Sequence, residues 1–223
     1  PGLNNFLDTP NRKLLQYLLE MLSVHAVGNA EQWSALYIWG EQSSGKSHLL
    51  SALAEWVRQN GGKVARVEGE LDKLNANEYG RRAEIYLLDD VELLLGDAHG
   101  ERALLTMLES LRQSNAMLVT TGGKSIASLN IALPDLASRL QAFQQFQLLA
   151  LADADKREVL QQRAHQRGIV LSEEVLNWLF THTGRELGML LELLERIDSF
   201  SLEHKRKVTI PLIRSILEVS TAP

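Results

Sequence analysis

The chain has 223 residues, of which 45% are hydrophobic and 23% charged, a globular composition that fits one large domain or a main domain with a smaller one. A net charge of −5 argues against a protein whose main task is gripping a nucleic acid backbone, so no strong direct DNA binding is expected. The absence of cysteine excludes disulfides and thiolate metal sites and suits the cytoplasm, and no apolar run is long enough to span a membrane.

An irregular arm and then a helix are predicted at the start of the chain. Residues 1–9 show no periodicity, whereas 10–26 carry leucines three and four residues apart on one helical face. Pro10 suits the first turn of that helix. Because the chain opens on Pro1 rather than on methionine, we expect further residues upstream of it.

The central motif is Gly40–Ser47, which reads G-E-Q-S-S-G-K-S and matches the phosphate-binding P-loop pattern G-x-x-x-x-G-K-[ST]. It lies between a predicted strand over 35–39 and a predicted helix over 46–59. In this setting backbone N–H groups and the positive end of the helix point at phosphate oxygens. Lys46 is expected to reach the terminal phosphates and Ser47 to hold Mg²⁺. The expected nucleotide-binding residues of this stretch are Gly40, Ser43, Ser44, Gly45, Lys46, Ser47 and His48.

A second nucleotide-handling signal follows the next predicted strand, 63–67, and an irregular connection. Four apolar residues, Ile85 to Leu88, end in two carboxylates. Such an unbroken run is typical of a strand buried in a parallel sheet, whose carboxyl end opens at the ligand crevice. We therefore expect Asp89 to face the Mg²⁺ ion and Asp90 to orient or deprotonate the attacking water.

The remaining elements of the first domain continue this alternation of helices and strands. A helix is predicted over 100–114, a strand over 116–120, a short helix over 133–140 and a last strand over 146–151. The polar residues Thr121-Gly122-Gly123 end the fourth strand. They are consistent with contact to the γ-phosphate and equally with a plain turn.

From Asp153 onward the pattern predicts helices only. The first helix opens at Asp153, Ser172 caps the second, Gly184-Arg185-Glu186 begins the third and Thr209-Ile210-Pro211 begins the fourth. The leucines at one face of the third helix are expected to form a core. The domains predicted from this change are an α/β nucleotide-binding domain over 1–151 and a helical domain over 152–223.

The order of these motifs resembles the AAA+ ATPases, and within them the family of the bacterial replication initiator DnaA and its shorter relative Hda. The matching stretches are Gly40–Ser47 for Walker A, Ile85–Asp90 for Walker B, 136–139 for the segment ending in an arginine finger, and 184–187 for sensor 2. The run 129–140 and the ending Thr209-Ile210-Pro211 resemble the Hda branch most closely. The resemblance implies an AAA+ P-loop α/β fold, with a five-stranded parallel sheet and a small all-helical lid domain.

Further site residues follow from the resemblance alone. Phe6 resembles the arm beside the adenine, Arg185 would contact phosphates from the lid, and Arg139 would act in trans on a nucleotide bound by a neighbouring subunit. The implied cofactors are ADP or ATP with Mg²⁺. Gly123 stands where the family tends to carry an acidic sensor 1 residue, so at most weak hydrolysis in cis is expected.

The leading hypothesis is a regulator of replication initiation of the Hda type. It would dock on ATP-bound DnaA and stimulate hydrolysis there through Arg139, together with the DNA polymerase sliding clamp, although no clamp-binding peptide is visible in this chain. Two expected departures favour a regulator over an initiator. The connection over 68–84 is expected to lack the initiator's helical insertion, and the sequence printed here shows no helix-turn-helix pattern after the lid. A homo-oligomer is the other expected assembly.

Two other classes of function remain open. One is a DNA-binding motor or helicase-loader-like AAA+ ATPase, which would need a basic groove and hydrolysis in cis. The other is a P-loop kinase acting on a small molecule, which would need a substrate pocket. The net charge and Gly123 count against the first, and the helical domain with Arg185 counts against the second.

Overall fold

The computed structural model describes residues 11–25, 33–67, 83–183, 187–204 and 208–219. The expected arm over 1–9, most of the connection over 68–84, and Phe6 and Arg185 lie outside these residues. The chain divides into two compact units, residues 1–150 and 151–223.

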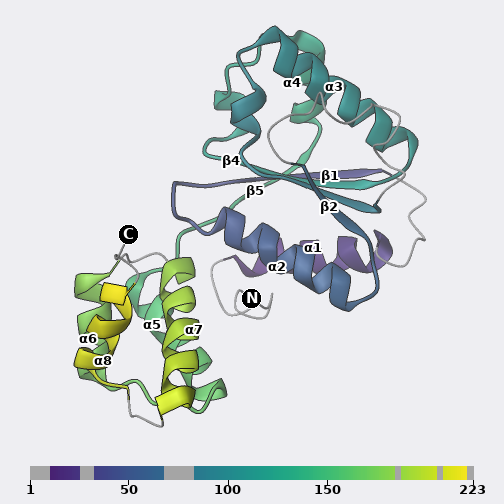
Figure 1. Ribbon diagram of the computed structural model, residues 1–223. Coiled ribbons are helices and arrows are strands. Elements are labelled where there is room, and N and C mark those ends of the chain that lie inside the picture. The colour runs from purple at the N-terminus through teal and green to yellow at the C-terminus, as the bar shows by residue number, and fades with distance from the viewer. Residues whose placement is uncertain (1–10, 26–32, 68–82, 184–186, 205–207, 220–223) are drawn as a thin grey trace. The chain divides into compact units, whose positions relative to one another are not determined.

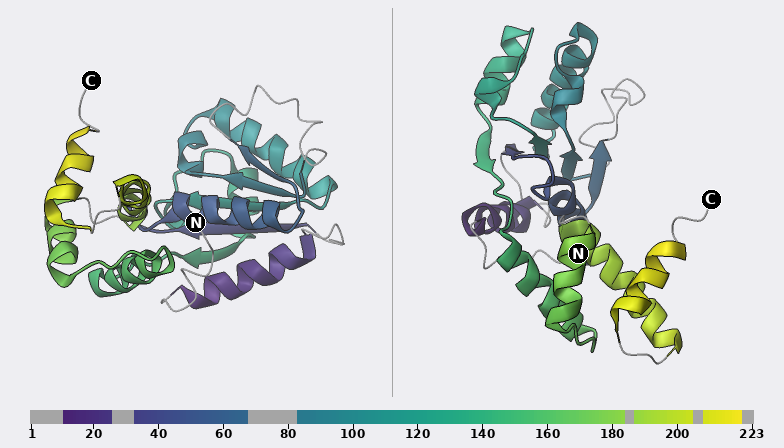
Figure 2. Two further views of the ribbon diagram at one scale, coloured as in Figure 1. Left: turned by 60° about the horizontal axis from the view of Figure 1, so that its bottom comes forward. Right: turned by 90° about the vertical axis from the view of Figure 1, so that its left-hand side faces the viewer.

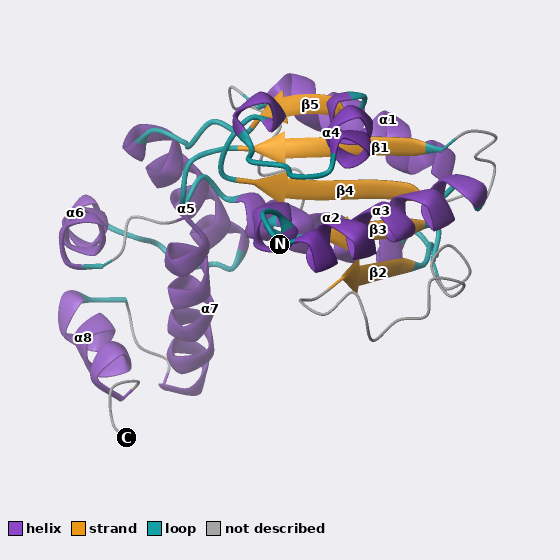
Figure 3. Cartoon of the chain, turned by 90° about the horizontal axis from the view of Figure 1, so that it is seen from above, coloured by secondary structure: helices purple, strands orange, loops and turns teal. Residues whose placement is uncertain are grey.

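The first unit is built on a five-stranded, wholly parallel sheet with strand order β2-β3-β4-β1-β5 (Figure 3). Its central strands are buried on both faces, which explains their nearly unbroken apolar sequences. The strands are β1 (Ser34–Trp39), β2 (Val64–Val67), β3 (Ile85–Leu88), β4 (Met117–Gly122) and β5 (Gln144–Gln147). The predicted five-stranded parallel sheet is therefore confirmed.

Two pairs of helices cover the two faces of this sheet (Figure 1). On one face, α1 (Arg12–His25) and α2 (Lys46–Gln59) pack their leucines against Leu36 and Ile38 of β1. On the other face, α3 (Ala98–Gln113) and α4 (Pro134–Gln141) pack around Tyr37. The alternation along β1 thus divides the core between the two helical layers.

Several boundaries differ from the predicted ones, and the last strand differs most. It was predicted over 146–151, but β5 spans Gln144–Gln147, because its pairing with β1 begins at Leu36 and the glutamines of this edge strand face solvent. The fourth strand also runs two residues beyond Thr120. Two short 3₁₀ turns, η4 (Val91–Leu94) and η5 (Ile126–Ser128), had no predicted counterpart.

Helices are the regular secondary structure of the second unit's described residues, and they are joined by short turns and loops (Figure 2). It consists of α5 (Asp153–Gln166), α6 (Glu173–His182), α7 (Leu187–His204) and α8 (Ile210–Val219). The predicted cap is present, since Val175 N donates to Ser172 Oγ over 3.3 Å. Leu190 and Leu194 of α7 are buried in the core of this unit, as expected for a leucine stripe.

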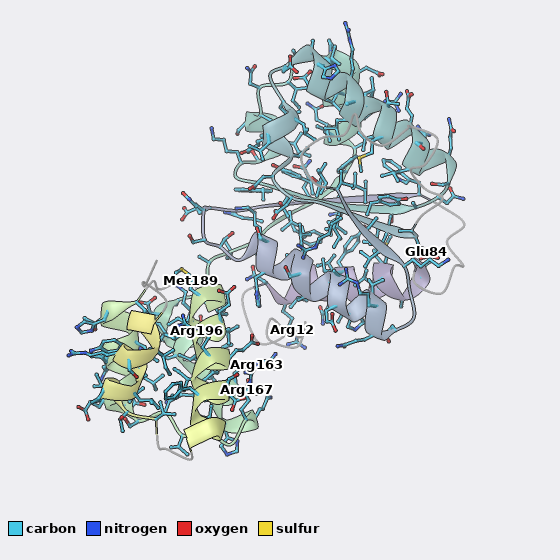
Figure 4. All side chains as sticks on the ribbon, in the orientation of Figure 1. Arg12, Glu84, Arg163, Arg167, Met189 and Arg196 are labelled. Carbon is cyan, nitrogen blue, oxygen red and sulfur yellow. The ribbon has the colours of Figure 1, made fainter. Side chains whose placement is uncertain are left out.

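Arginines tie the helices of the second unit together. Arg167, which follows α5, pairs with Glu195 at 3.0 Å and with Asp198 at 3.7 Å on α7. Arg196 of α7 donates to the carbonyl of Ile216 on α8. Figure 4 shows Arg163, Arg167 and Arg196 within this unit. None of the described helices in either unit has the length and apolarity needed to cross a bilayer.

A fully buried carboxylate fixes two loops of the first unit. Glu101 in the first turn of α3 is 0% exposed, and its carboxylate accepts hydrogen bonds from Gly96 N (2.9 Å), Ala132 N (2.9 Å) and Leu133 N (2.7 Å). Desolvation acts to raise the pKa of Glu101, but the three backbone donors outweigh it and leave the pKa below its ordinary value of 4.5.

This lowered pKa predicts an acid-dependent loss of stability. The ionised carboxylate stabilises the folded state at pH values above about 4.5, and the contribution disappears as the pH falls through the lower folded-state pKa. At pH 7 we expect Glu101→Gln to lower the free energy of unfolding by about 2 kcal/mol, because a charge-assisted hydrogen bond is lost. Urea unfolding of both proteins at pH 7 and near pH 3 checks this. A difference that stays constant or grows on acidification would contradict it.

Candidate nucleotide-binding site

Two glycines of the P-loop are required by its backbone. Gly45 adopts a left-handed conformation with φ 99° and is the N-cap of α2. At Gly40 a Cβ atom would lie 2.5 Å from the carbonyl oxygen of Leu148 and 2.7 Å from Ser44 Oγ. The loop therefore turns tightly from the end of β1 into the positive N-terminus of α2, as predicted from the sequence.

Polar groups of this loop fit a bound polyphosphate. Ser44 is only 8% exposed, and its side-chain oxygen is buried without a hydrogen-bond partner. Lys46 Nζ lies over the loop and donates to the carbonyls of Gly40 (2.9 Å) and Glu41 (3.0 Å). A hydroxyl donor with no partner and an ammonium above the helix N-terminus are the groups that phosphate oxygens require. Ser43, Ser47 and His48 belong to the same loop and helix start.

The two aspartates expected at the end of β3 are joined to β4 through one hydroxyl. Thr121 Oγ1 donates to Asp89 Oδ1 over 2.5 Å and accepts from Asp90 N over 2.9 Å. Desolvation and repulsion from Asp89 and Glu92 raise the pKa of Asp90, and Lys46 opposes them. Lys46 is thus close enough to the Asp90 carboxylate to influence its charge.

One residue of this region escaped the sequence reasoning. Glu92, in η4, accepts hydrogen bonds from the backbone N–H groups of Gly123 and Lys124, both at 3.1 Å, and a Cβ at Gly123 would lie 3.3 Å from Glu92 Oε2. The Glu92 carboxylate of η4 therefore lies at the carboxyl end of β4. No signal in the spacing reveals it, because its partners are backbone groups about thirty residues away.

Arg139 lies on the opposite side of the sheet from α2, the helix that follows the P-loop. It lies on α4, on the face opposite α2, where its guanidinium pairs with Glu109 at 2.9 Å and Asp135 at 3.5 Å. Its side chain is 29% exposed and both partners are more exposed still. Such pairs contribute little to stability, so the arginine is available to another partner.

A Mg²⁺ ion in this region would need phosphate oxygens of the nucleotide among its ligands. Among the described residues no group of three or more histidine and carboxylate side chains is arranged to hold a metal ion. Mg²⁺ in nucleotide sites typically takes one or two protein oxygens, with phosphate and water completing its shell. Ser47 and Asp89 match that requirement in residue type.

Comparison with known proteins agrees with this fold. Residues 153–217 match the family model described as the Hda lid domain. An uncharacterized protein of Haemophilus influenzae is 34% identical over 187 residues, which are 82% of this chain and 81% of that protein. Domain III of DnaA from Thermotoga maritima superposes with a TM-score of 0.73 at 21% identity, covering 100% of this chain and 97% of the other. AMPPCP-bound DnaA from Aquifex aeolicus gives a TM-score of 0.66 at 20% identity, covering 92% and 67%.

The parallel sheet, the P-loop and the separate helical unit define an AAA+ ATPase with a lid domain. Residues 153–217 belong to the Hda lid domain family, and the chain as a whole has the fold of the DnaA AAA+ domain.

Proposed function

We propose that the P-loop of this protein binds ADP or ATP with Mg²⁺. The single observation that carries the proposal is the loop itself: a left-handed Gly45 at the N-terminus of α2, a buried Ser44 hydroxyl with no partner, and Lys46 above the same helix end. The proteins of similar fold include a DnaA whose structure holds AMPPCP, an analogue of ATP. Ser47 and Asp89 are assigned to Mg²⁺, Asp90 to the attacking water, and Phe6 and Arg185 to the nucleotide.

The biological role that fits best is an Hda-type regulator that promotes hydrolysis of ATP bound to DnaA. Two observations support it. The match of residues 153–217 is to the Hda lid, and Arg139 lies on the opposite face of the sheet from α2, where exposed carboxylates are its partners. An arginine supplied in trans offsets the charge that develops on the transferring phosphoryl group.

This role is tested by single-turnover hydrolysis. DnaA loaded with labelled ATP is mixed with the protein in its ADP-bound form, in the presence and absence of DNA-loaded sliding clamp. We expect faster conversion of bound ATP to ADP, with the clamp increasing the effect. Unchanged turnover in both conditions would reject the role. The clamp, a homo-oligomer and a cytoplasmic location are parts of the same proposal.

Lys46→Ala is expected to remove nucleotide binding without unfolding the protein. At 100 times its dissociation constant, a ligand that binds only the native state stabilises it by about 2.7 kcal/mol, which raises Tm by about 5–10 °C in a chain of this size. We expect this rise with ADP for the wild type and none for the variant. Lys13→Ala, an exposed lysine on α1, is the matched control and should retain the full rise. Equal shifts in Lys46→Ala and wild type would contradict the assignment.

A second candidate function is a DNA-dependent ATPase that hydrolyses its own nucleotide. The Glu92 carboxylate at the tip of β4 favours it, because it restores an acidic group where Gly123 has none. ATP turnover by the isolated protein, strongly stimulated by single-stranded DNA and suppressed by salt, would support this candidate over the regulator.

A further inference from the structure

The buried carboxylate of Glu101 joins two segments that belong to different parts of the site. Gly96 follows η4, the turn that continues from Asp89 and Asp90, and its N–H bonds to Glu101 Oε1. Ala132 N bonds to the same oxygen, and Leu133 N bonds to Oε2. One side chain therefore connects the segment after the two aspartates with the loop that leads into α4.

The second of these loops determines where α4 begins. Leu133 is the N-cap residue of α4, Pro134 follows it without an N–H group, and Ala137 N donates to the carbonyl of Leu133 over 3.0 Å. No side-chain hydrogen bond caps this helix. The carboxylate bond to Leu133 N therefore holds the N-cap residue of α4, fewer than about two helical turns before Arg139.

Close packing and hydrogen bonds also constrain η4, the segment that follows Asp90. A Cβ at Gly100 would lie 2.7 Å from the carbonyl of Leu94, so η4 packs directly on the start of α3. Glu92 of the same turn accepts hydrogen bonds from Gly123 N and Lys124 N. The position of η4 is thus fixed relative to β4 on one side and to Glu101 on the other.

We propose that Glu101 is a positioning residue for the trans activity, fixing α4 and hence Arg139 relative to the segment after Asp90. This inference rests on the proposed function, because it takes Arg139 as the group that acts on the partner's nucleotide. A carboxylate suits the task since it has no N–H of its own and can accept all three backbone donors at once. Its burial excludes water, which would otherwise compete for those donors.

Glu101→Gln is the sharpest test of this role. The amide has nearly the same shape, but only its oxygen accepts, so its NH₂ group must face at least one of the three donors. With the oxygen kept on Gly96 and Ala132, the lost bond is the one to Leu133, directly before α4. We expect stimulation of DnaA-bound ATP hydrolysis to fall about 10- to 100-fold, the loss that follows when a catalytic group is misplaced by about 1 Å. Binding of the protein's own ADP should change by less than about twofold.

Two further variants separate positioning from simple loss of stability. Asp97→Ala removes the N-cap of the same helix, where Asp97 Oδ2 accepts from Gly100 N over 3.0 Å, and leaves the loop before α4 untouched. It should lower Tm yet keep stimulation within about twofold of the wild type. In the background of Arg139→Ala, Glu101→Gln should cause no further loss, because residues acting through one group are not additive.

Amide hydrogen exchange gives a readout that does not depend on the partner. Exchange of the amides over 129–140 should accelerate in Glu101→Gln and stay unchanged in Asp97→Ala. Unaltered exchange there, or an additive loss in the double variant, would overturn the positioning role. If wild type gives no stimulation at all, the trans function fails, and with it the claim that Glu101 serves Arg139; faster exchange would then show only a structural clamp.

Discussion

Arg139→Ala is expected to lower the stimulated rate of hydrolysis of DnaA-bound ATP by about 10³-fold or more, because an arginine acting in trans accounts for about 10³ to 10⁵ in such reactions. Binding of the protein's own nucleotide should be unaffected, since Arg139 lies on the face of the sheet opposite α2. The fold should survive as well, because its partners Glu109 and Asp135 are exposed and such surface pairs contribute about 1 kcal/mol or less. Single-turnover hydrolysis with each variant measures the effect.

Two variants sharpen this prediction. Arg139→Lys keeps the positive charge but loses the planar fork of donors, so we expect it to restore only a small part of the rate. Arg102→Ala, an exposed arginine on the neighbouring helix α3, controls for a general loss of positive charge and should act like the wild type. Full stimulation by Arg139→Ala, or an equal loss in Arg102→Ala, would reject the assignment of the arginine.

Gly122→Ala is expected to be among the most destabilising single substitutions in the chain, lowering the free energy of unfolding by about 3 kcal/mol or more. A Cβ at this position would lie 2.1 Å from Tyr37 Oη and 2.9 Å from Tyr37 Cζ. Tyr37 is 0% exposed and donates to the carbonyl of Lys124 over 2.5 Å, so the ring cannot move without losing a buried hydrogen bond. Burial, with the nearby carboxylates of Glu92 and Asp90, raises the pKa of Tyr37 and keeps its hydroxyl a donor.

The cause of that destabilisation can be isolated with a second substitution. Tyr37→Phe removes the clashing oxygen, so it should cost about 1 kcal/mol alone and rescue part of the loss in the double variant. Gly188→Ala in α7 is the matched control, because no atom lies within 4 Å of the added methyl and alanine favours a helix. Denaturant unfolding measures all four proteins. Strict additivity of the Gly122 and Tyr37 substitutions would show that the steric explanation is wrong.

Local patterns predicted the elements that carry the nucleotide-binding motifs. The helix expected over 46–59 is α2 with the same bounds, because the P-loop fixes its start and Asn60-Gly61 its end. The buried strand before Asp89 and Asp90 and the Ser172 cap were likewise found from their sequences. The edge strand β5 was misplaced because its residues are mostly polar glutamines, and its position is set by pairing with β1.

Local sequence patterns could not predict the long-range hydrogen bonds that organise the site. Glu92 and Glu101 each bond to backbone N–H groups about thirty residues away, and every residue but proline carries such a group. Thr121 joins both aspartates across neighbouring strands, a contact that depends on the register of β3 with β4. The sequence therefore shows that a carboxylate is present, but it does not show which backbone N–H groups bind it.

The measurement that tests the central claim most directly is a calorimetric titration of ADP and of ATP with Mg²⁺ into the purified protein, repeated with Lys46→Ala. We predict one nucleotide bound per wild-type chain and no measurable heat of binding for the variant, because the loop before α2 supplies the phosphate contacts. Absence of binding by the wild type to either nucleotide, or the same isotherm from Lys46→Ala, would contradict the account.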